Sequence, residues 1–311
     1  MARNRLQVLS DGFDGLTLPM VSQSEVEFTQ LYHELKKVSR RDVTQGIKLA
    51  KYKKSAKSML KRDPVDANVL LGLVACLEHD ITSMHDYHKN AIAVSGCCLS
   101  LMFYAASLEK SCLWNESAKY ALLALDHEPD NPRLLDAIIS LAPLTGRFSL
   151  LKRLLPQWQQ ANGGQIHPHR ADCEKIGEVL SINGLLEKDL KEVLADIGDA
   201  LSETELILHK IDYEVVIERH GSAFIHYRFV IPDQFVASFY EDLIAAKLDA
   251  GQYHPRIFEA FSFSVENSTV YELYDYMEKE LVASADTIRV PSPDKMKLIE
   301  ELVAGVEIGA W

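Results

Sequence analysis

Apolar positions in the first half of the chain recur at helical spacing and are interrupted at a regular interval. Three residues that stop helices lie 32 and 33 positions apart: Pro64, Gly96 and Pro129. The small or apolar residues five positions before them keep that spacing: Met59, Ala91 and Ala124. Apolar helical stretches at 68–78 and 99–109 precede the last two stops. The pattern predicts consecutive helix pairs with a period of about 33 residues.

After residue 170 the pattern changes to two helices and then to alternation of apolar and polar residues. Helices are predicted at 172–180, 186–201, 233–248, 270–283 and 294–303, and strands at 205–211, 213–219, 224–231 and 256–265. A three-residue turn, His220-Gly221-Ser222, separates the two clearest strands.

The register of that hairpin follows from its apolar face. Pairing Tyr213 with Phe229 and Val215 with Tyr227 places every apolar side chain on one side. Glu214 then lies opposite Arg228 on the polar side. The predicted fold is therefore an all-α solenoid followed by an α+β domain with a mostly antiparallel sheet covered by helices.

Charge divides the chain at a similar place. Residues 1–165 carry 20 basic and 17 acidic side chains, whereas residues 166–311 carry 13 and 28, for net charges of +3 and −15. The Asn162-Gly163-Gly164-Gln165 stretch between them has linker composition. We predict an N-terminal arm at 1–33, a helical repeat domain at 34–162 and an acidic α+β domain at 170–311.

The helical repeat resembles that of the tetratricopeptide repeat family, over about residues 34–160. The closest match is 101–131, where 115–120 precede Ala124-Leu125 and Pro129-Asp130-Asn131, and Gly146-Arg147-Phe148 lies at the inter-helix turn of a further unit. Ser117 and Leu151 stand where the family usually has alanine, Pro143 interrupts one helix, and the first predicted helix (34–44) is polar.

This resemblance implies protein or peptide binding, as in adaptors and regulators, through a groove lined by the first helix of each pair. The residues that it places in the groove are Val69, Leu73, Cys76, Leu99, Met102, Ala106, Glu109, Arg133, Asp136 and Ser140. Most of them are apolar, so capture of a C-terminal carboxylate is not expected. An apolar groove needs a cover, and a partner helix, the N-terminal arm and the second domain are all candidates.

Residues 36–62 hold eleven basic side chains and one acidic side chain, Asp42. They form a candidate basic face that includes Lys48, Lys51, Lys54 and Lys61. Such a face can be merely solvated, or it can meet an acidic partner, the chain's own acidic half, or nucleic acid. Nucleic acid is disfavoured because the whole chain has a net charge of −12 and no series of aromatic residues is interleaved with the lysines.

Catalytic motifs are absent from the sequence: it has no glycine-rich phosphate loop, nucleophile elbow or His-Glu-x-x-His helix. Two histidine groups, His79/His85/His88 and His167/His169 with Cys173, lack complete ligand sets, so no metal or cofactor is expected. The predicted hairpin places Glu214, His226 and Arg228 on its polar face, either as an acid–base site or as an ordinary solvated face. A non-enzymatic interaction protein is the leading hypothesis, and an enzyme with its site in the C-terminal domain is the alternative.

Five cysteines, two of them adjacent at Cys97-Cys98, do not suggest a disulfide framework. The uncharged stretch 90–108 contains Ser95-Gly96, which is turn chemistry, so no membrane span is expected. The N-terminus has no pattern of a secretory signal. We therefore expect a cytoplasmic protein, and an open sheet edge would offer a route to homo-oligomers.

Overall fold

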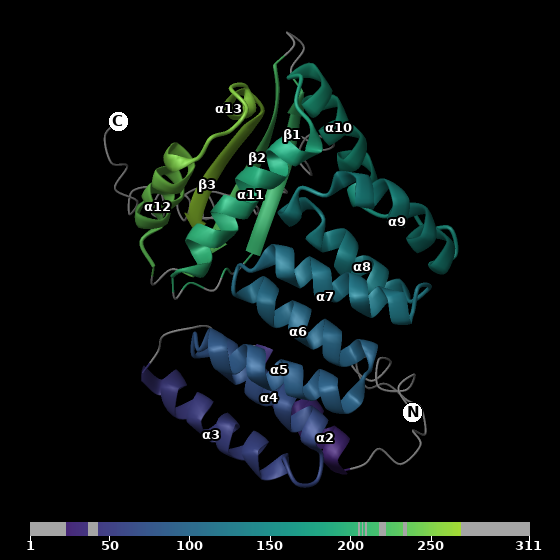
Figure 1. The fold of residues 1–311 in the computed structure, drawn as a ribbon, viewed down its shortest axis with the longest axis vertical. Coiled ribbons are helices and arrows are strands. Elements are labelled where there is room, and N and C mark those ends of the chain that lie inside the picture. The colour runs from purple at the N-terminus through teal and green to yellow at the C-terminus, as the bar shows by residue number, and fades with distance from the viewer. Residues whose placement is uncertain are drawn as a thin grey trace, which may run out of the picture. The chain divides into compact units, whose positions relative to one another are not determined.

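The computed structural model describes residues 23–36, 43–204, 206, 208, 210–217, 222–232 and 235–268. The helices predicted at 270–283 and 294–303, and the turn residues His220 and Gly221, lie outside the described residues. The chain forms two compact units, residues 1–267 and residues 268–311. The features described below belong to the first unit. Its described residues form twelve α-helices and a small three-stranded mixed sheet (Figure 1).

Three consecutive helix pairs follow the predicted period. They are α4 (Pro64–Leu77) with α5 (Ile81–Ser95), α6 (Cys98–Lys110) with α7 (Trp114–His127), and α8 (Pro132–Leu141) with α9 (Phe148–Ala161). The first helices begin 34 residues apart at 64, 98 and 132, and the second helices begin 33 and 34 residues apart. Each helix packs against its partner, and α4 also packs against α6.

Local chemistry fixes the ends of these helices. Asp63 caps α4 by accepting from the Asp66 amide, and Pro64 occupies the first turn, where its missing N–H costs nothing. Pro64 thus begins a helix and does not stop one. Gly96 ends α5 in the left-handed conformation at φ 56°, which glycine adopts without the steric penalty of a side chain. After α8, Pro143 opens a short 3₁₀ turn (η1, Pro143–Thr145), so the predicted interruption is present.

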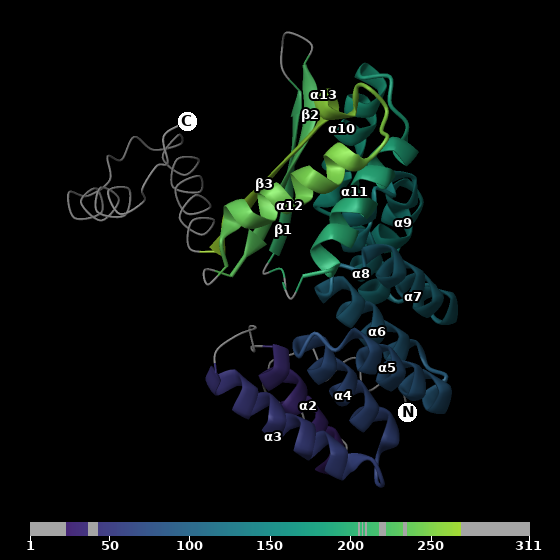
Figure 2. The ribbon, with the colours of Figure 1, turned by 60° about the vertical axis from the view of Figure 1, so that its left-hand side comes forward.

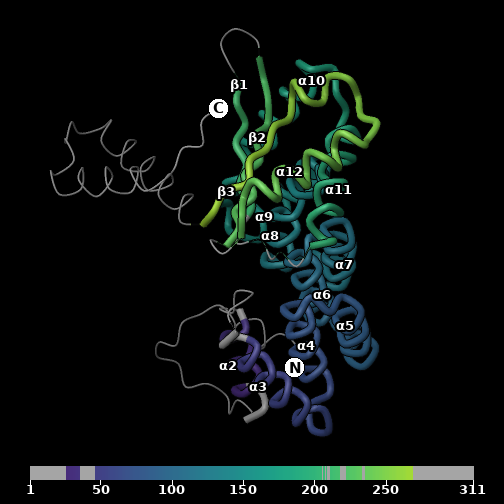
Figure 3. The backbone as a smooth tube through the Cα atoms, turned by 90° about the vertical axis from the view of Figure 1, so that its left-hand side faces the viewer, coloured from purple at the N-terminus to yellow at the C-terminus, as the bar shows by residue number. Residues whose placement is uncertain are grey.

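The polar helix predicted at 34–44 falls largely on residues 37–42, which lie outside the described residues. Helix α2 spans Gln23–Lys36, and α3 spans Val43–Met59. Phe28, Leu31 and Leu35 give α2 its apolar face at helical spacing. The predicted end of the N-terminal arm, at residue 33, therefore falls inside a helix. Figure 3 shows α2 beside α4, against which it packs.

The remaining elements combine helices with the sheet. They are α10 (His169–Ile182), α11 (Glu187–Ser202), β1 (Lys210–Ile217), β2 (Ala223–Ile231), α12 (Ala237–Ala250), α13 (Ile257–Ala260) and β3 (Phe261–Asn267). The strand predicted at 256–265 begins too early, because residues 257–260 form α13. Residues 205, 207 and 209 of the strand predicted at 205–211 lie outside the described residues, and its last two residues belong to β1, the strand predicted at 213–219. Strand β1 is antiparallel to β2, whereas β3 is parallel to it, so the sheet is mixed and not mostly antiparallel. The parallel pairing arises because α12 and α13 carry the chain back between β2 and β3 (Figure 2).

The hairpin register differs from the prediction by two residues. Tyr213 faces Tyr227 and not Phe229, and five residues lie between the paired Ile217 and Ala223 instead of three. Side chains alternate with a period of two, so this shift leaves every residue on its predicted face. The alternation of apolar and polar residues predicted which face of the sheet each side chain lies on. It did not predict which residue of the neighbouring strand each residue pairs with.

One apolar core extends across the predicted linker. It includes residues from Cys98 to Val265 and thus joins both halves of the chain. The rings of Trp114 and Phe229 stack with centroids 6.1 Å apart, and the Tyr227 hydroxyl donates to the Pro143 carbonyl at 3.0 Å. The division into domains at 34–162 and 170–311 stays a prediction, but the charge boundary is not a boundary between two separate cores.

None of the helices among the described residues is both long and apolar enough to cross a membrane.

Candidate functional site

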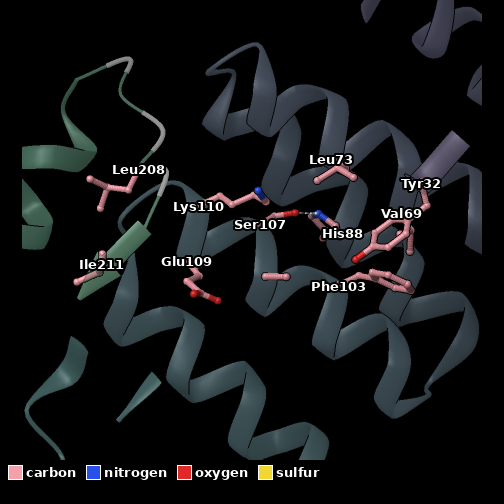
Figure 4. Close-up of a pocket in the computed structure, with 11 residues that line it drawn as sticks. Tyr32, Val69, Leu73, His88, Phe103, Ser107, Glu109, Lys110, Leu208 and Ile211 are labelled. Atoms are coloured by element: carbon pink, nitrogen blue, oxygen red, sulfur yellow. Dashed lines mark hydrogen bonds between the residues drawn. The ribbon is translucent and has the colours of Figure 1, made fainter. Parts of the chain in front are cut away.

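A pocket of about 300 Å³ opens on the first helices of two neighbouring pairs. Val69 and Leu73 of α4 and Phe103 of α6 form its walls (Figure 4), and Ala106 of α6 also lines it. The other residues that line it are Tyr32 of α2, His88 of α5, Ser107, Glu109 and Lys110 of α6, and Leu208 and Ile211 at the start of the sheet. The groove thus has parts of four helices and one strand around it.

Helix α2 closes one end of this pocket. The Tyr32 ring meets the Phe103 ring edge to face with centroids 5.1 Å apart, and Phe28 meets Phe103 in the same way at 5.6 Å. Such edge contacts are favoured geometries for aromatic pairs. The predicted need for a cover is therefore met in part by a segment of the chain itself.

A neutral histidine forms the floor. His88 and Ser107 are both fully buried, and His88 Nε2 and Ser107 Oγ are hydrogen-bonded at 2.8 Å. The imidazole stacks on Tyr104, and its other side lies against Gly72, where an added Cβ would come within 2.6 Å of the ring. Burial, with a smaller contribution from His85, lowers the pKa of His88 to about 3. His88 is therefore uncharged at neutral pH and acts as a packed part of the helix pair.

The low pKa of His88 predicts a loss of stability in mild acid. Its pKa falls from 6.5 to about 3 on folding, so protonation favours the unfolded chain. The contribution of neutral His88 to the free energy of unfolding is fully present above about pH 6.5 and is lost as the pH falls toward 3. Between pH 7 and pH 5 we expect His88 to lower the free energy of unfolding by ~2 kcal/mol. Urea titrations at both pH values should show a smaller pH dependence in His88→Phe than in the unsubstituted chain, and an equal dependence would contradict this assignment.

Two charged side chains lie at the other end of the pocket. Figure 4 shows Glu109 and Lys110 at the end nearest Leu208 and Ile211. The Glu109 side chain is solvent-exposed, yet the surrounding protein displaces enough water to raise the pKa of its carboxyl. An apolar ligand group entering here would meet one acceptor and one cation at the rim.

Four of the ten predicted groove residues line the pocket: Val69, Leu73, Ala106 and Glu109. Three others are packed, since Cys76 is fully buried with its thiol near the Ser107 carbonyl, and Leu99 and Met102 lie against apolar clusters. The remaining three do not line it: Arg133, Asp136 and Ser140.

Sequence reasoning missed several walls of the site. Phe103 follows Leu99 by four residues and precedes Ala106 by three, so helical spacing could have placed it on the same face. No local pattern could have found Tyr32, Leu208 and Ile211, because they reach the pocket from segments distant in sequence. Their positions depend on how α2 and the start of β1 pack on the repeats.

The predicted basic face is exposed on α3 and on the turn after it. Its four lysines all point to solvent: Lys48, Lys51, Lys54 and Lys61. Lys53 differs, since its Nζ lies 2.5 Å from Glu78. No acidic residue occurs within α3, so its outer side presents positive charge only.

The polar face of the sheet brings Glu214, His226 and Arg228 together. Glu214 lies opposite His226, and not opposite Arg228 as predicted. Arg228 Nη2 is 3.9 Å from Glu214 and 3.6 Å from Asp212. This face therefore has charged neighbours on adjacent strands, which is a common stabilising arrangement for a sheet.

The imidazole of His226 lies between two serines of β3. Its Nδ1 is 2.9 Å from Ser262 Oγ, and its Nε2 is 3.2 Å from Ser264 Oγ. Burial lowers the pKa of His226 against the opposing effect of Glu214. An imidazole near a hydroxyl can act as a base, but a carboxylate usually orients such a base, and here hydroxyl groups occupy both ring nitrogens.

The histidines singled out as candidate ligands bind other side chains. His85 Nδ1 is hydrogen-bonded to the Tyr104 hydroxyl, His167 Nε2 lies 3.2 Å from Asp136, and His169 Nδ1 lies 2.9 Å from the Tyr213 hydroxyl. In the part of the chain that the structure describes, no three His, Cys, Asp or Glu side chains are placed to hold a metal ion.

Comparison with known proteins identifies no relative of this chain. The resemblance to tetratricopeptide repeats therefore depends on residue pattern and helix spacing alone. No family model matches this chain, and no curated protein or solved structure is significantly similar to it.

Proposed function

We propose that this chain is a non-enzymatic interaction protein, an adaptor or regulator that binds a segment of another protein in the groove on α4 and α6. The observation that carries the proposal is the pocket of about 300 Å³ formed by the first helices of successive pairs. Apolar walls with a few polar groups at the rim are typical of binding sites for apolar side chains.

The helix spacing supports a TPR-like solenoid as the framework. Helices α4 and α6 start 34 residues apart and pack on each other, as the first helices of stacked repeats do. A hairpin that cannot bury its own apolar face gains stability from its neighbour. In this proposal the solenoid supplies shape and surface, and its own residues carry out no reaction.

The lysine face of α3 is proposed as a second contact, for an acidic region of the same partner. Lys48, Lys51, Lys54 and Lys61 are exposed on an element without acidic residues. Charge complementarity of this kind raises association rates and selects partners more than it adds affinity. Salt should therefore weaken this contact and spare the apolar groove.

We expect groove binding to be lost when the pocket is filled. Ala106→Trp would place an indole between the walls, whereas Ala93→Trp adds the same group at an exposed position of α5 outside the lining. Lysates of the source cells would be passed over the full chain and over both variants, and the captured proteins would then be tested in purified form. A true partner should bind the unsubstituted chain and Ala93→Trp equally and Ala106→Trp at least about tenfold more weakly.

A third variant of the chain would distinguish the groove contact from the contact at the lysine face. Replacing Lys51, Lys54 and Lys61 by alanine should slow association with the same partner, with little effect at high salt. If every captured protein bound Ala106→Trp as well as the unsubstituted chain, the groove would not be the binding site.

The alternative of an enzyme has one supporting observation, the placement of His226 between Ser262 and Ser264 with Glu214 on the adjacent strand. Nucleic acid binding has only the lysine face, and the net charge of −12 opposes it. The interaction role is better supported because it uses a formed pocket.

Compartment and assembly complete the proposal. The five cysteines, all among the described residues, form no disulfide with one another, which fits the reducing environment of the cytoplasm. In the described sheet β1 and β3 are the outer strands, and either could pair with a second copy of the chain.

A further inference from the structure

Helix α2 covers the Tyr32 end of the groove with the apolar face of an amphipathic helix. Phe28 and Leu35 are buried in one apolar cluster with residues of α3, α4, α5 and α6, and Leu31 and Tyr32 pack partly against the same cluster. These four side chains sit at positions i, i+3, i+4 and i+7 of one helix face. That spacing is the pattern by which amphipathic helices anchor in apolar grooves.

The packing of α2 differs from that of the repeat helices. In the later pairs, α4 packs along α5 and α6 packs along α7. Helices α2 and α3 are consecutive, yet each packs chiefly on α4 and not along the other. Helix α2 therefore packs mainly on α4 and meets α6 at the Phe103 ring, and it does not form the first half of a regular helix pair.

Polar contacts also join α2 to its neighbours, among them a side-chain hydrogen bond between Glu34 and Tyr52 of α3. Arg62 Nη2 lies 2.5 Å from Glu27 in an ion pair whose side chains are both more than a third exposed. Exposed pairs of this kind contribute little because solvent screens them. The four apolar side chains of α2 pack into one cluster, and a partner helix of similar pattern could replace them there.

We infer that α2 is a resident competitor for the groove, and that the partner is an amphipathic helix presenting aromatic and leucine side chains at the spacing of Phe28, Leu31, Tyr32 and Leu35. This inference rests on the proposed function and names the class of partner for the same site. A partner helix then displaces α2 and extends over the pocket at the Tyr32 end. Because α2 is part of the same chain, its high effective concentration weakens binding of any partner in trans.

The test uses the full chain and a labelled peptide of residues 23–36 with blocked ends. Gln30 is exposed in the middle of α2, so Gln30→Pro breaks the helix without altering a groove residue. Gln30→Ala keeps the helix and is the matched control. Fluorescence anisotropy should show that Gln30→Pro binds the peptide at least about tenfold more tightly than Gln30→Ala. A peptide carrying Phe28→Asp and Leu35→Asp should not bind either chain.

Equal peptide affinity in folded Gln30→Pro and Gln30→Ala would overturn the inference. Thermal unfolding would establish that both variants fold. If Gln30→Pro does not fold, hydrogen exchange of the unsubstituted chain decides: excess peptide should speed exchange of the α2 amides, and unchanged exchange would refute displacement.

The failure of this inference can be told apart from failure of the proposed function. Suppose that a captured protein binds the unsubstituted chain and not Ala106→Trp, while the α2 peptide binds neither. The proposed function would then stand, and the inference that α2 competes for the groove would be rejected. Peptide binding that Ala106→Trp does not weaken would locate the peptide outside the pocket and reject the inference.

Discussion

Phe229→Ala is expected to lower the free energy of unfolding by about 3–5 kcal/mol, because it removes a large, fully buried ring and leaves a cavity. The ring lies in β2 and stacks on Trp114 of α7 and on Tyr227. It therefore joins the sheet to a helix of the second repeat pair. Loss of this contact should weaken both regions together.

Urea unfolding followed by far-UV circular dichroism and by tryptophan fluorescence measures this effect. The two signals should coincide in one transition, as expected for a continuous core. Phe239→Ala is the matched control, since that ring is 57% exposed, and we expect a change of less than about 1 kcal/mol. Two separate transitions, with only one affected by Phe229→Ala, would instead favour independent domains on either side of residue 165.

Gly72→Ala is expected to destabilise the chain by about 1–3 kcal/mol, although alanine is normally better than glycine inside a helix by roughly 1 kcal/mol. The added Cβ would come within 2.6 Å of the His88 ring. That ring cannot retreat easily, because Tyr104 stacks on it and Ser107 holds its Nε2. Steric overlap should therefore outweigh the gain in helix propensity.

Two further variants test the cause. Gly46 lies in α3 with nothing within 4 Å of an added Cβ, so Gly46→Ala should stabilise the chain by ~0.5–1 kcal/mol. In a background of His88→Ala, Gly72→Ala should lose most of its cost, which denaturant titration of the four members of the cycle would show. Additive effects at Gly72 and His88 would mean that the close contact is not the source of the destabilisation.

The repeat pattern predicted the helix pairs because a helix pair is a local structure. Stop residues such as Gly96 and periodic apolar positions act over one or two turns, so a single sequence reveals them. Helix α2 was missed because the packing partner of its apolar face, α4, lies beyond α3 in the sequence. The hairpin face was predicted and its register was not, since a shift of two residues keeps Tyr213 and Val215 on the apolar side.

The candidate site also contains residues that the sequence predicted and residues that it did not. Val69, Leu73 and Ala106 were predicted because the resemblance to tetratricopeptide repeats places the first helices of successive pairs along one groove, and these three residues do line the pocket. Tyr32 and Leu208 were not predicted, because they reach the pocket from segments on either side of the repeats.

By itself, the sequence determined the helix pairs, the two faces of the hairpin and the uneven distribution of charge. These features depend on periodicity and composition, which act locally along the chain. Only the tertiary structure decided that one core joins the helices to the sheet, that β3 is parallel to β2, and that α2 packs on α4 at one end of the pocket. Those outcomes depend on which apolar faces meet, and many distant faces in one chain have similar hydrophobicity, so shape complementarity selects among them.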